Sequence, residues 1–167
     1  MRWFEKFAAY IEKNGGRRDL YREGDNGLPE LYMSRYYILK TPIFELMLHN
    51  FHVSDRPEFH DHPSSSGGII LAEGYNEHTL NGIVEKRVGS IGYRRATDFH
   101  WVEVRPGTES KVWTLFFFFK RTRNWGFLIN NVWIAHREYF KMRNTAVVES
   151  SEKEYKGWIF PRKEVNE

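Results

Sequence analysis

Apolar residues recur with a helical period at the start of the chain. Four of them fall at helical spacing within residues 2–13, with charged side chains between them: Trp3, Phe7, Tyr10 and Ile11. This pattern predicts an amphipathic helix. The Asn14-Gly15-Gly16 run that follows is typical of a helix end. Residues 17–29 are polar and contain glycine and proline, so we expect them to form a loop.

Beyond residue 30 the period shortens to two, which is typical of β-strands. Runs rich in Tyr, Ile, Val and Phe alternate with turn residues, and we expect strands at 31–39, 43–53, 59–62, 68–72, 75–80, 83–88, 90–94, 99–104 and 112–119. Asn81-Gly82 between two such runs is a strong β-hairpin signal. Many short strands separated by turns predict a β-sandwich or barrel.

The chain after residue 120 is less regular. Residues 125–129 suit a strand and residues 133–143 a short helix, while the charged stretch from Ser150 is expected to fray, with residues 158–160 able to dock back. A chain of 167 residues suits one domain with one core. We therefore predict a single, mainly β domain over 1–167, with an N-terminal helix and loop (1–29), a barrel core (30–120) and a partly helical C-terminal extension (121–167).

The run from Phe116 to Phe119 places aromatic side chains on both faces of its strand. The inward pair should line the core or a cavity. The outward pair needs a cover, either the N-terminal helix or a second subunit.

The composition narrows the possible chemistry. The chain has no cysteine, which excludes disulfides, thiolate metal ligands and a cysteine nucleophile. Any transition metal must therefore be held by His, Asp or Glu. The formal net charge is only +3 although the pI is about 9.1, which is a weak indication of anionic partners.

Two basic clusters lie near tryptophans: Lys120, Arg121 and Arg123, and Arg137, Lys141 and Arg143. Basic residues interleaved with aromatic ones can bind nucleic acid. The charge excess is too small to favour that function, so we expect a small-molecule substrate and no nucleic acid.

The sequence also argues against a membrane partner. The longest aromatic run, 115–119, is far too short to span a bilayer. The N-terminus lacks the apolar region and cleavage site of a signal peptide. We therefore expect a cytoplasmic protein.

His60 and His62 carry the strongest chemical signal. On an extended strand, residues two apart point to the same face, so two imidazoles would enter one cavity. His100 lies on a later predicted strand. Three imidazoles form a plausible site for a divalent ion, whereas the plainer interpretation is a pair of surface histidines beside a turn.

Five residues follow the order of a two-part signature: His60, His62, Gly74, Gly89 and His100. Their spacing resembles that of the cupins, small jelly-roll barrels that hold a metal inside. The chain departs from the cupin motifs at five positions, where other residues replace Gly, Glu, Pro, Gly and Asn: Ser54, Gly67, Arg95, Thr97 and Val104. The resemblance covers roughly 31–119. It implies a jelly-roll barrel, and cupins often form homodimers through a sheet.

The missing glutamate makes the site look like that of the thiol dioxygenases, cupins with three histidines and no carboxylate ligand. Their ligand strand reads His-Asp-His, as His60-Asp61-His62 does here. The run from Leu31 to Arg35 resembles the strand whose arginine anchors the substrate carboxylate in cysteine dioxygenase. The resemblance implies a non-haem Fe(II) site, with Arg35 orienting an anionic substrate.

The same family has a Ser-His-Tyr relay after the third histidine. It falls on the run from Thr114 to Phe118, where phenylalanine stands at the His and Tyr positions. We therefore expect cysteine itself to be a poor substrate. The sequence as a whole also looks like that of bacterial and phage cupins with no assigned role.

Two further sets of side chains are candidates for the site. Glu77 and His78 are neighbours on a predicted strand, so only one of them can face inward. The inward residue could be a fourth metal ligand or an acid/base. Alternatively, both could lie on a solvated hairpin. Arginine can hold a carboxylate with two hydrogen bonds, and the candidates are Arg35, Arg94 and Arg95.

The alternation of side chains along a strand, together with the motif, bears on the remaining candidates. Arg94 and Arg95 are neighbours, so at most one faces the cavity. Asp61 should point away from its flanking histidines, in a structural or supporting role. His49 and His52 lack the glycine frame of the signature, and we interpret both as structural.

We interpret the chain as a non-haem Fe(II) oxygenase of the dioxygenase type acting on a small anionic or polar substrate. His60, His62 and His100 would hold the metal, and Glu77 and Arg35 would act in catalysis. Zn, Ni and Mn are alternatives to iron because imidazole suits several divalent ions. Two other functions stay open: a non-catalytic small-molecule-binding cupin, and a metal-dependent isomerase or epimerase of sugars or keto acids with Glu77 as base.

Overall fold

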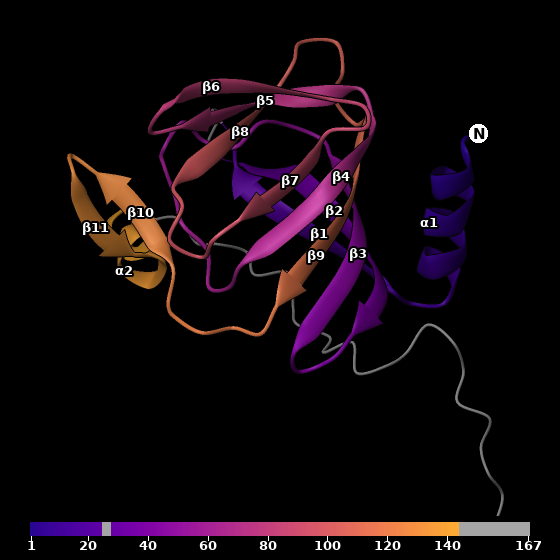
Figure 1. Cartoon of the computed structure of the whole chain (residues 1–167), viewed down its shortest axis with the longest axis horizontal. Coiled ribbons are helices and arrows are strands. Elements are labelled where there is room, and N and C mark those ends of the chain that lie inside the picture. The colour runs from indigo at the N-terminus through magenta and orange to yellow at the C-terminus, as the bar shows by residue number, and fades with distance from the viewer. Residues whose placement is uncertain (25–27, 144–167) are drawn as a thin grey trace, which may run out of the picture.

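The computed structural model describes residues 1–24 and 28–143, which form two helices and eleven strands (Figure 1). In chain order these are α1 (Trp3–Lys13), β1 (Arg17–Glu23), β2 (Pro29–Lys40), β3 (Phe44–Phe51), β4 (Ser66–Ala72), β5 (Gly74–Thr79), β6 (Gly82–Arg87), β7 (Ile91–Arg94), β8 (His100–Val104), β9 (Val112–Phe119), β10 (Gly126–Ile129), β11 (Val132–Ala135) and α2 (His136–Met142). The mainly β prediction is confirmed.

Three antiparallel sheets organise the strands. The largest has the order β1-β2-β3-β9-β4-β7, a second has the order β6-β5-β8, and β10 pairs with β11. Buried residues of the two larger sheets pack together in one cluster: Met33, Phe51 and Val112 from the first, and Val102 and Val104 from the second. The two sheets therefore enclose a barrel interior, with α1 at one side and the β10–β11–α2 unit at another (Figure 1).

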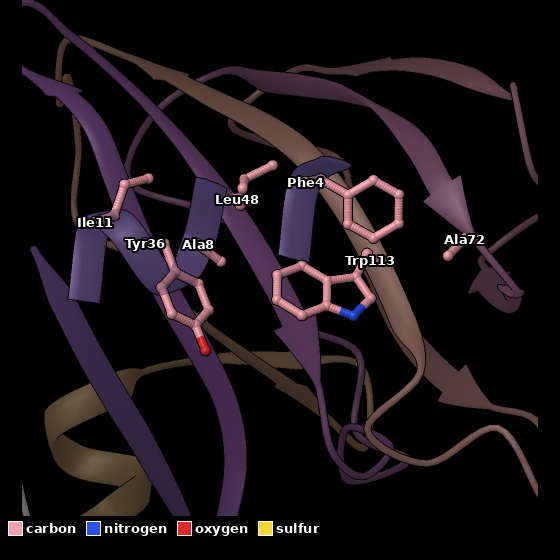
Figure 2. Packing of buried hydrophobic residues seen from close by; sticks show 7 residues of the cluster. All are labelled: Phe4, Ala8, Ile11, Tyr36, Leu48, Ala72 and Trp113. Carbon is pink, nitrogen blue, oxygen red and sulfur yellow. The ribbon is translucent and has the colours of Figure 1, made fainter. Parts of the chain in front are cut away.

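The helix α1 covers the outer face of the largest sheet. Its buried residues join buried residues of four strands in a single cluster (Figure 2): Phe4, Ala8, Ile11, Tyr36, Leu48, Ala72 and Trp113. The ring of Trp113 lies 5.5 Å from that of Phe4 and 5.6 Å from that of Tyr36. The predicted helix is confirmed, but its buried face differs from the predicted stripe: Phe4, Ala8 and Ile11 are buried, whereas Trp3 and Tyr10 are exposed.

The aromatic run of β9 divides between the two faces as its parity predicts. Phe116 and Phe118 point into the barrel, where the ring of Phe116 stacks on His49 at 4.8 Å. Phe117 and Phe119 lie on the outer face and pack against Phe44. Phe44 thus contributes to covering the outward pair.

Two adjacent glycines allow β4 to run closely between its neighbours. A Cβ atom at Gly68 would lie 2.4 Å from the Leu115 carbonyl oxygen, and one at Gly67 would lie 2.6 Å from that of Gly92. Any side chain at these positions would require the strands to separate.

The structure corrects three boundaries. Arg17–Glu23 is a strand rather than a loop, and it pairs with β2 from Arg17↔Tyr36 onward. As an edge strand it needs no continuous apolar face, so its polar sequence concealed it. Residues 59–62 form no regular strand, because only His60 makes bridge pairs.

The third correction concerns the C-terminal extension. Residues 133–143 divide between β11 and α2, since the helix begins only at His136. The predicted hairpin at Asn81-Gly82 is confirmed, and Gly82 has φ +119°. The expectations for residues from Ser150 onward lie outside the described residues. No helix in the described part of the chain combines the length and apolar character that crossing a bilayer requires.

Candidate metal centre

Three histidines from two separate segments of the chain converge. One ring nitrogen from each of His60, His62 and His100 lies within 4.8 Å of the others. His100 opens β8, while His60 and His62 lie on the connection between β3 and β4. The structure therefore confirms that the three imidazoles lie close together, as predicted.

Backbone hydrogen bonds hold this connection in place on several sides. His60 and His100 exchange two bonds of 3.0 Å each, from N–H to carbonyl oxygen in both directions. The Asp61 N–H donates to Gly126 O, and the His62 N–H donates to Ala96 O, both at 3.0 Å. Three consecutive residues are thus fixed to separate parts of the chain.

The spacing of the imidazoles approximately fits one ion. The Nε2 atoms of His62 and His100 lie 2.7 Å apart. Two nitrogens each about 2.1 Å from one ion would be roughly 3.0–3.4 Å apart in octahedral or tetrahedral arrangements. A divalent ion would therefore fit after the two rings separate by a few tenths of an ångström.

The second ring nitrogens of two histidines face oxygen atoms. His60 Nδ1 lies 3.4 Å from the carbonyl oxygen of Glu58. His100 Nδ1 lies 3.2 Å from Glu77 Oε1, although the direction is not that of a hydrogen bond. Metal-bound histidines commonly donate this second N–H to a carbonyl or carboxylate, which would direct the two Nε2 atoms towards an ion.

The surroundings favour uncharged imidazoles. Burial lowers the pKa of His62 well below its usual value, with further contributions from His100, His60 and Arg94. Burial likewise lowers the pKa of His100, with Arg94 the next cause. Neutral imidazole is the form that binds a metal.

Gly67 stands where the cupin motif has its glutamate. It is the direct partner of Phe117 in the β4–β9 register, and a Cβ atom there would lie 2.7 Å from Cζ of Phe117. Because Phe117 lies on the outer face, a side chain at residue 67 would point outward and not into the barrel interior.

Glu77 is the member of its pair that faces inward. Its side chain is buried, forms an ion pair with Arg94, and has its Oε2 atom 3.3 Å from Lys86 Nζ. His78 points outward, stacks on Trp101 with ring centroids 3.6 Å apart, and lies 2.9 Å from Glu103 Oε2. The catalytic role predicted for Glu77 stays a prediction.

The three candidate arginines have different positions. Arg94 reaches the barrel interior, whereas Arg95 is exposed, as the parity argument required. Arg35 lies with its guanidinium 5.7 Å from the ring centroid of Phe118. Both Arg35 and Arg94 contribute to the lowered pKa of His62, after burial and the two neighbouring histidines.

Asp61 anchors the β10–β11 hairpin to the histidine segment. Its carboxylate is 1% exposed and accepts hydrogen bonds from Arg123, from Gly126 N at 2.7 Å and from Trp133 Nε1 at 3.0 Å. Strand parity indicated that Asp61 points away from its neighbours. No local signal indicated its three partners, because they lie more than 60 residues downstream.

The two remaining histidines of the middle strands lie apart from the metal-site group. His49 is buried inside the barrel, and its ring stacks on Phe116. His52 Nε2 lies 2.9 Å from Ser34 Oγ, and His52 Nδ1 lies 2.8 Å from Ser110 Oγ. Neither belongs to the three-histidine group.

A cavity of about 460 Å³ opens between the two larger sheets. Glu77 and Arg94 line it, and most of its remaining lining is apolar, aromatic or hydroxyl-bearing. Glu77 thus contacts His100 and also reaches the cavity. Sequence reasoning missed Lys86, whose amphipathic strand gave no sign that this lysine turns inward.

No family model and no curated protein matches the chain. Solved structures of similar fold include KdgF from Halomonas sp., at 13% identity over 61% of this chain and 88% of that one, with a TM-score of 0.46. The Fe(II) form of HppE is 15% identical over 63% of this chain and 57% of its own, with a TM-score of 0.49.

A third similar structure is a conserved protein with a double-stranded β-helix domain from Klebsiella pneumoniae. It is 13% identical over 70% of this chain and 92% of its own, with a TM-score of 0.46. Likenesses this distant say nothing about activity. The chain itself folds as a mainly antiparallel β-barrel that carries a group of three histidines.

Proposed function

We propose that this protein is a metal-dependent enzyme that binds a divalent ion, Fe(II) first, on His60, His62 and His100. We further propose that it acts as a non-haem oxygenase on a small anionic or polar substrate. The observation that carries the proposal is the convergence of three imidazole nitrogens within 4.8 Å. A divalent ion on three neutral imidazoles keeps its full charge and open coordination positions, which can bind substrate and O2 or polarise a carbonyl.

The protein's own residues supply the surroundings that such chemistry needs. Phe118 and Phe127 place rings 6.2 Å from His62 and 5.8 Å from His60, respectively, which limits the access of water. Arg35, whose guanidinium lies 5.7 Å from the ring centroid of Phe118, would hold an anionic group of the substrate. Glu77 would orient His100 through its Nδ1 atom.

The contacts of Glu77 bear on the isomerase alternative. A general base has to reach a substrate proton. Glu77 is instead held by two cations and lies against His100. This arrangement suits a positioning role for Glu77 better than proton abstraction, and it therefore favours the oxygenase.

Metal content is the first test. Protein purified without a metal-affinity tag should contain about one divalent ion per chain by elemental analysis. His62→Ala should lose it, while His78→Ala, a histidine change on the outer face, should keep it. Equal metal content in the two variants would remove the basis of the proposal.

Oxygen chemistry is the second test. The Fe(II)-loaded protein should bind nitric oxide without air and give a paramagnetic signal that an added anionic substrate perturbs. Substrate-dependent O2 consumption is the further requirement. Turnover that Zn supports equally well, with no nitric oxide signal from a confirmed Fe(II) site, would favour the isomerase. A protein that retains the metal but turns over no substrate would favour the non-catalytic small-molecule-binding function. The cytoplasmic location and the homodimer stay predictions.

A further inference from the structure

The cavity between the two sheets contains buried hydroxyl groups without partners. Ser66 and Thr114 line it and are 1% and 2% exposed. Neither hydroxyl has a hydrogen-bond partner among residues 1–24 and 28–143. Leaving a buried polar group unpaired costs about 1–3 kcal/mol, so such groups in a cavity wall indicate a polar ligand or ordered water.

Two cations and one carboxylate meet in the enclosed part of the cavity. Glu77 is paired with both Arg94 and Lys86, and the three side chains are 7%, 15% and 21% exposed. The fourth charged residue of the lining, Asp98, is exposed, and its carboxylate accepts a hydrogen bond from Arg95 N. Burial lowers the pKa of Arg94, while Asp55 and Asp98 favour its charged form. The two cations thus share a single buried carboxylate, with two further carboxylates at longer range.

Ser66 and Arg94 lie side by side on neighbouring strands. Ser66 is the direct partner of Arg94 in the β4–β7 register, so their side chains point to the same face with Cβ atoms about 4.5–5.5 Å apart. An anionic group that reaches both side chains would meet several hydrogen-bond donors.

The other walls are mostly apolar. They include Ile70, Tyr75, Val84, Tyr93, Phe99 and Phe116. The volume of about 460 Å³ falls within the roughly 300–1,000 Å³ of typical small-molecule sites. An apolar body with one charged end would match this lining.

We propose that the cavity binds a small organic monocarboxylate with an apolar body, and that Arg94, Lys86 and Ser66 receive its carboxylate. A single negative charge suits this group better than a phosphate dianion, because Glu77, Asp55 and Asp98 already place negative charge near the two cations. The inference rests on the proposed function and deepens it by naming the substrate class, and it adds Arg94, which lines the cavity, as an anchor for the carboxylate beside the role proposed for Arg35. Glu77 competes with the ligand for the same cations and joins the cavity to His100.

Calorimetric titration of the metal-free protein tests the proposal, with phenylacetate as the probe. Phenylacetate should bind at least tenfold more tightly than its neutral isostere phenylacetamide, and more tightly than acetate or inorganic phosphate. Arg94→Gln and Lys86→Gln should each weaken phenylacetate binding about tenfold or more. Arg95→Gln is the matched control, because this neighbouring arginine is exposed, and it should bind like the wild type.

Glu77→Gln gives the sharpest result. Removal of the competing carboxylate should tighten phenylacetate binding severalfold, whereas a site for a cationic ligand would respond in the opposite direction. Weaker binding in Glu77→Gln, equal binding of the amide, or tighter binding of phosphate would overturn the proposal. If Arg94→Gln fails to fold, the Lys86→Gln and Glu77→Gln variants still test the proposal.

The outcome is separate from that of the metal proposal. The titration needs no metal, so a protein without a metal site could still bind phenylacetate. Conversely, a metal-loaded protein that ignores all carboxylates would overturn this inference alone.

Discussion

Two neighbouring rungs of the largest sheet have opposite characters. Tyr36, Leu48 and Leu115 stand opposite one another on β2, β3 and β9 and face α1. One residue away along each strand, Arg35, His49 and Thr114 form the next rung and face the barrel interior. The outer rung packs as hydrocarbon and aromatic surface. The inner rung carries three buried polar atoms with no hydrogen-bond partner within the described residues.

The outer rung therefore contributes mainly to stability, whereas the inner rung of the same strands carries groups that are available for binding. Burial of apolar surface against α1 stabilises the fold at about 25 cal/mol per Å². The inner polar atoms cost free energy unless water or a ligand satisfies them. We therefore expect substitutions that disturb the cluster under α1 to destabilise the protein, and substitutions of the polar residues that face the barrel interior to change binding. The following changes test this division, from the largest expected loss of stability to the smallest.

Trp113→Ala should cause the largest loss. The indole is 7% exposed and packs between the rings of Phe4 and Tyr36. Its removal leaves a cavity under α1, and we expect the free energy of unfolding to fall by about 3–5 kcal/mol. Denaturant unfolding measures this, and metal content below the transition should not change. Loss of metal from the folded variant would contradict this separation between stability and metal binding.

Asp61→Asn tests the boundary between the two regions. The amide keeps the volume but weakens the bonds to Arg123 and Trp133, so we expect a loss of about 1–3 kcal/mol. Asp61 lies between His60 and His62, and a looser segment should also weaken metal binding by about tenfold. Unfolding and metal titrations measure the two effects. An unchanged metal affinity would show that the hairpin anchor is purely structural.

His49 should make the stability of the metal-free protein depend on pH. Burial lowers its pKa well below the usual value, and Arg35 adds to this. The unfolded chain, with a pKa near 6.5, then binds more protons at acid pH. Stability is therefore complete above about pH 6.5 and falls as the pH decreases towards the folded pKa.

His49→Phe removes that titration while keeping a ring against Phe116. Between pH 7 and pH 5 the wild type should lose up to about 2 kcal/mol more than His49→Phe. Denaturant unfolding across this range measures the difference. Parallel pH profiles would show that His49 is solvated in the folded protein.

His62→Ala should have the smallest effect on stability, about 1 kcal/mol or less in the metal-free protein, because His62 belongs to neither hydrophobic cluster. Its thermal midpoint should stay close to that of His78→Ala. An unfolded metal-free His62→Ala variant would assign the histidines to the fold instead of the chemistry.

Much of this architecture follows from local patterns. The alternation along residues 43–53 and 112–119 predicted β3 and β9, because side chains of a strand alternate between faces by geometry alone. The same parity predicted that Arg94 and Arg95 separate, and that only one of Glu77 and His78 faces inward. The polar edge strand β1 and the irregular segment around His60 escaped prediction, since neither has a continuous apolar face.

The sequence by itself determined the spacing of His60 and His62, the absence of thiolate ligands and the two-faced character of β9. Only the tertiary structure decided that His100 meets the other two histidines, that Glu77 carries two cations, and that Asp61 holds a distant hairpin. These contacts join residues about 10 to 70 positions apart, and such pairs depend on sheet register and chain closure. Parity assigns a side chain to a face, whereas only the closed barrel determines what it meets there.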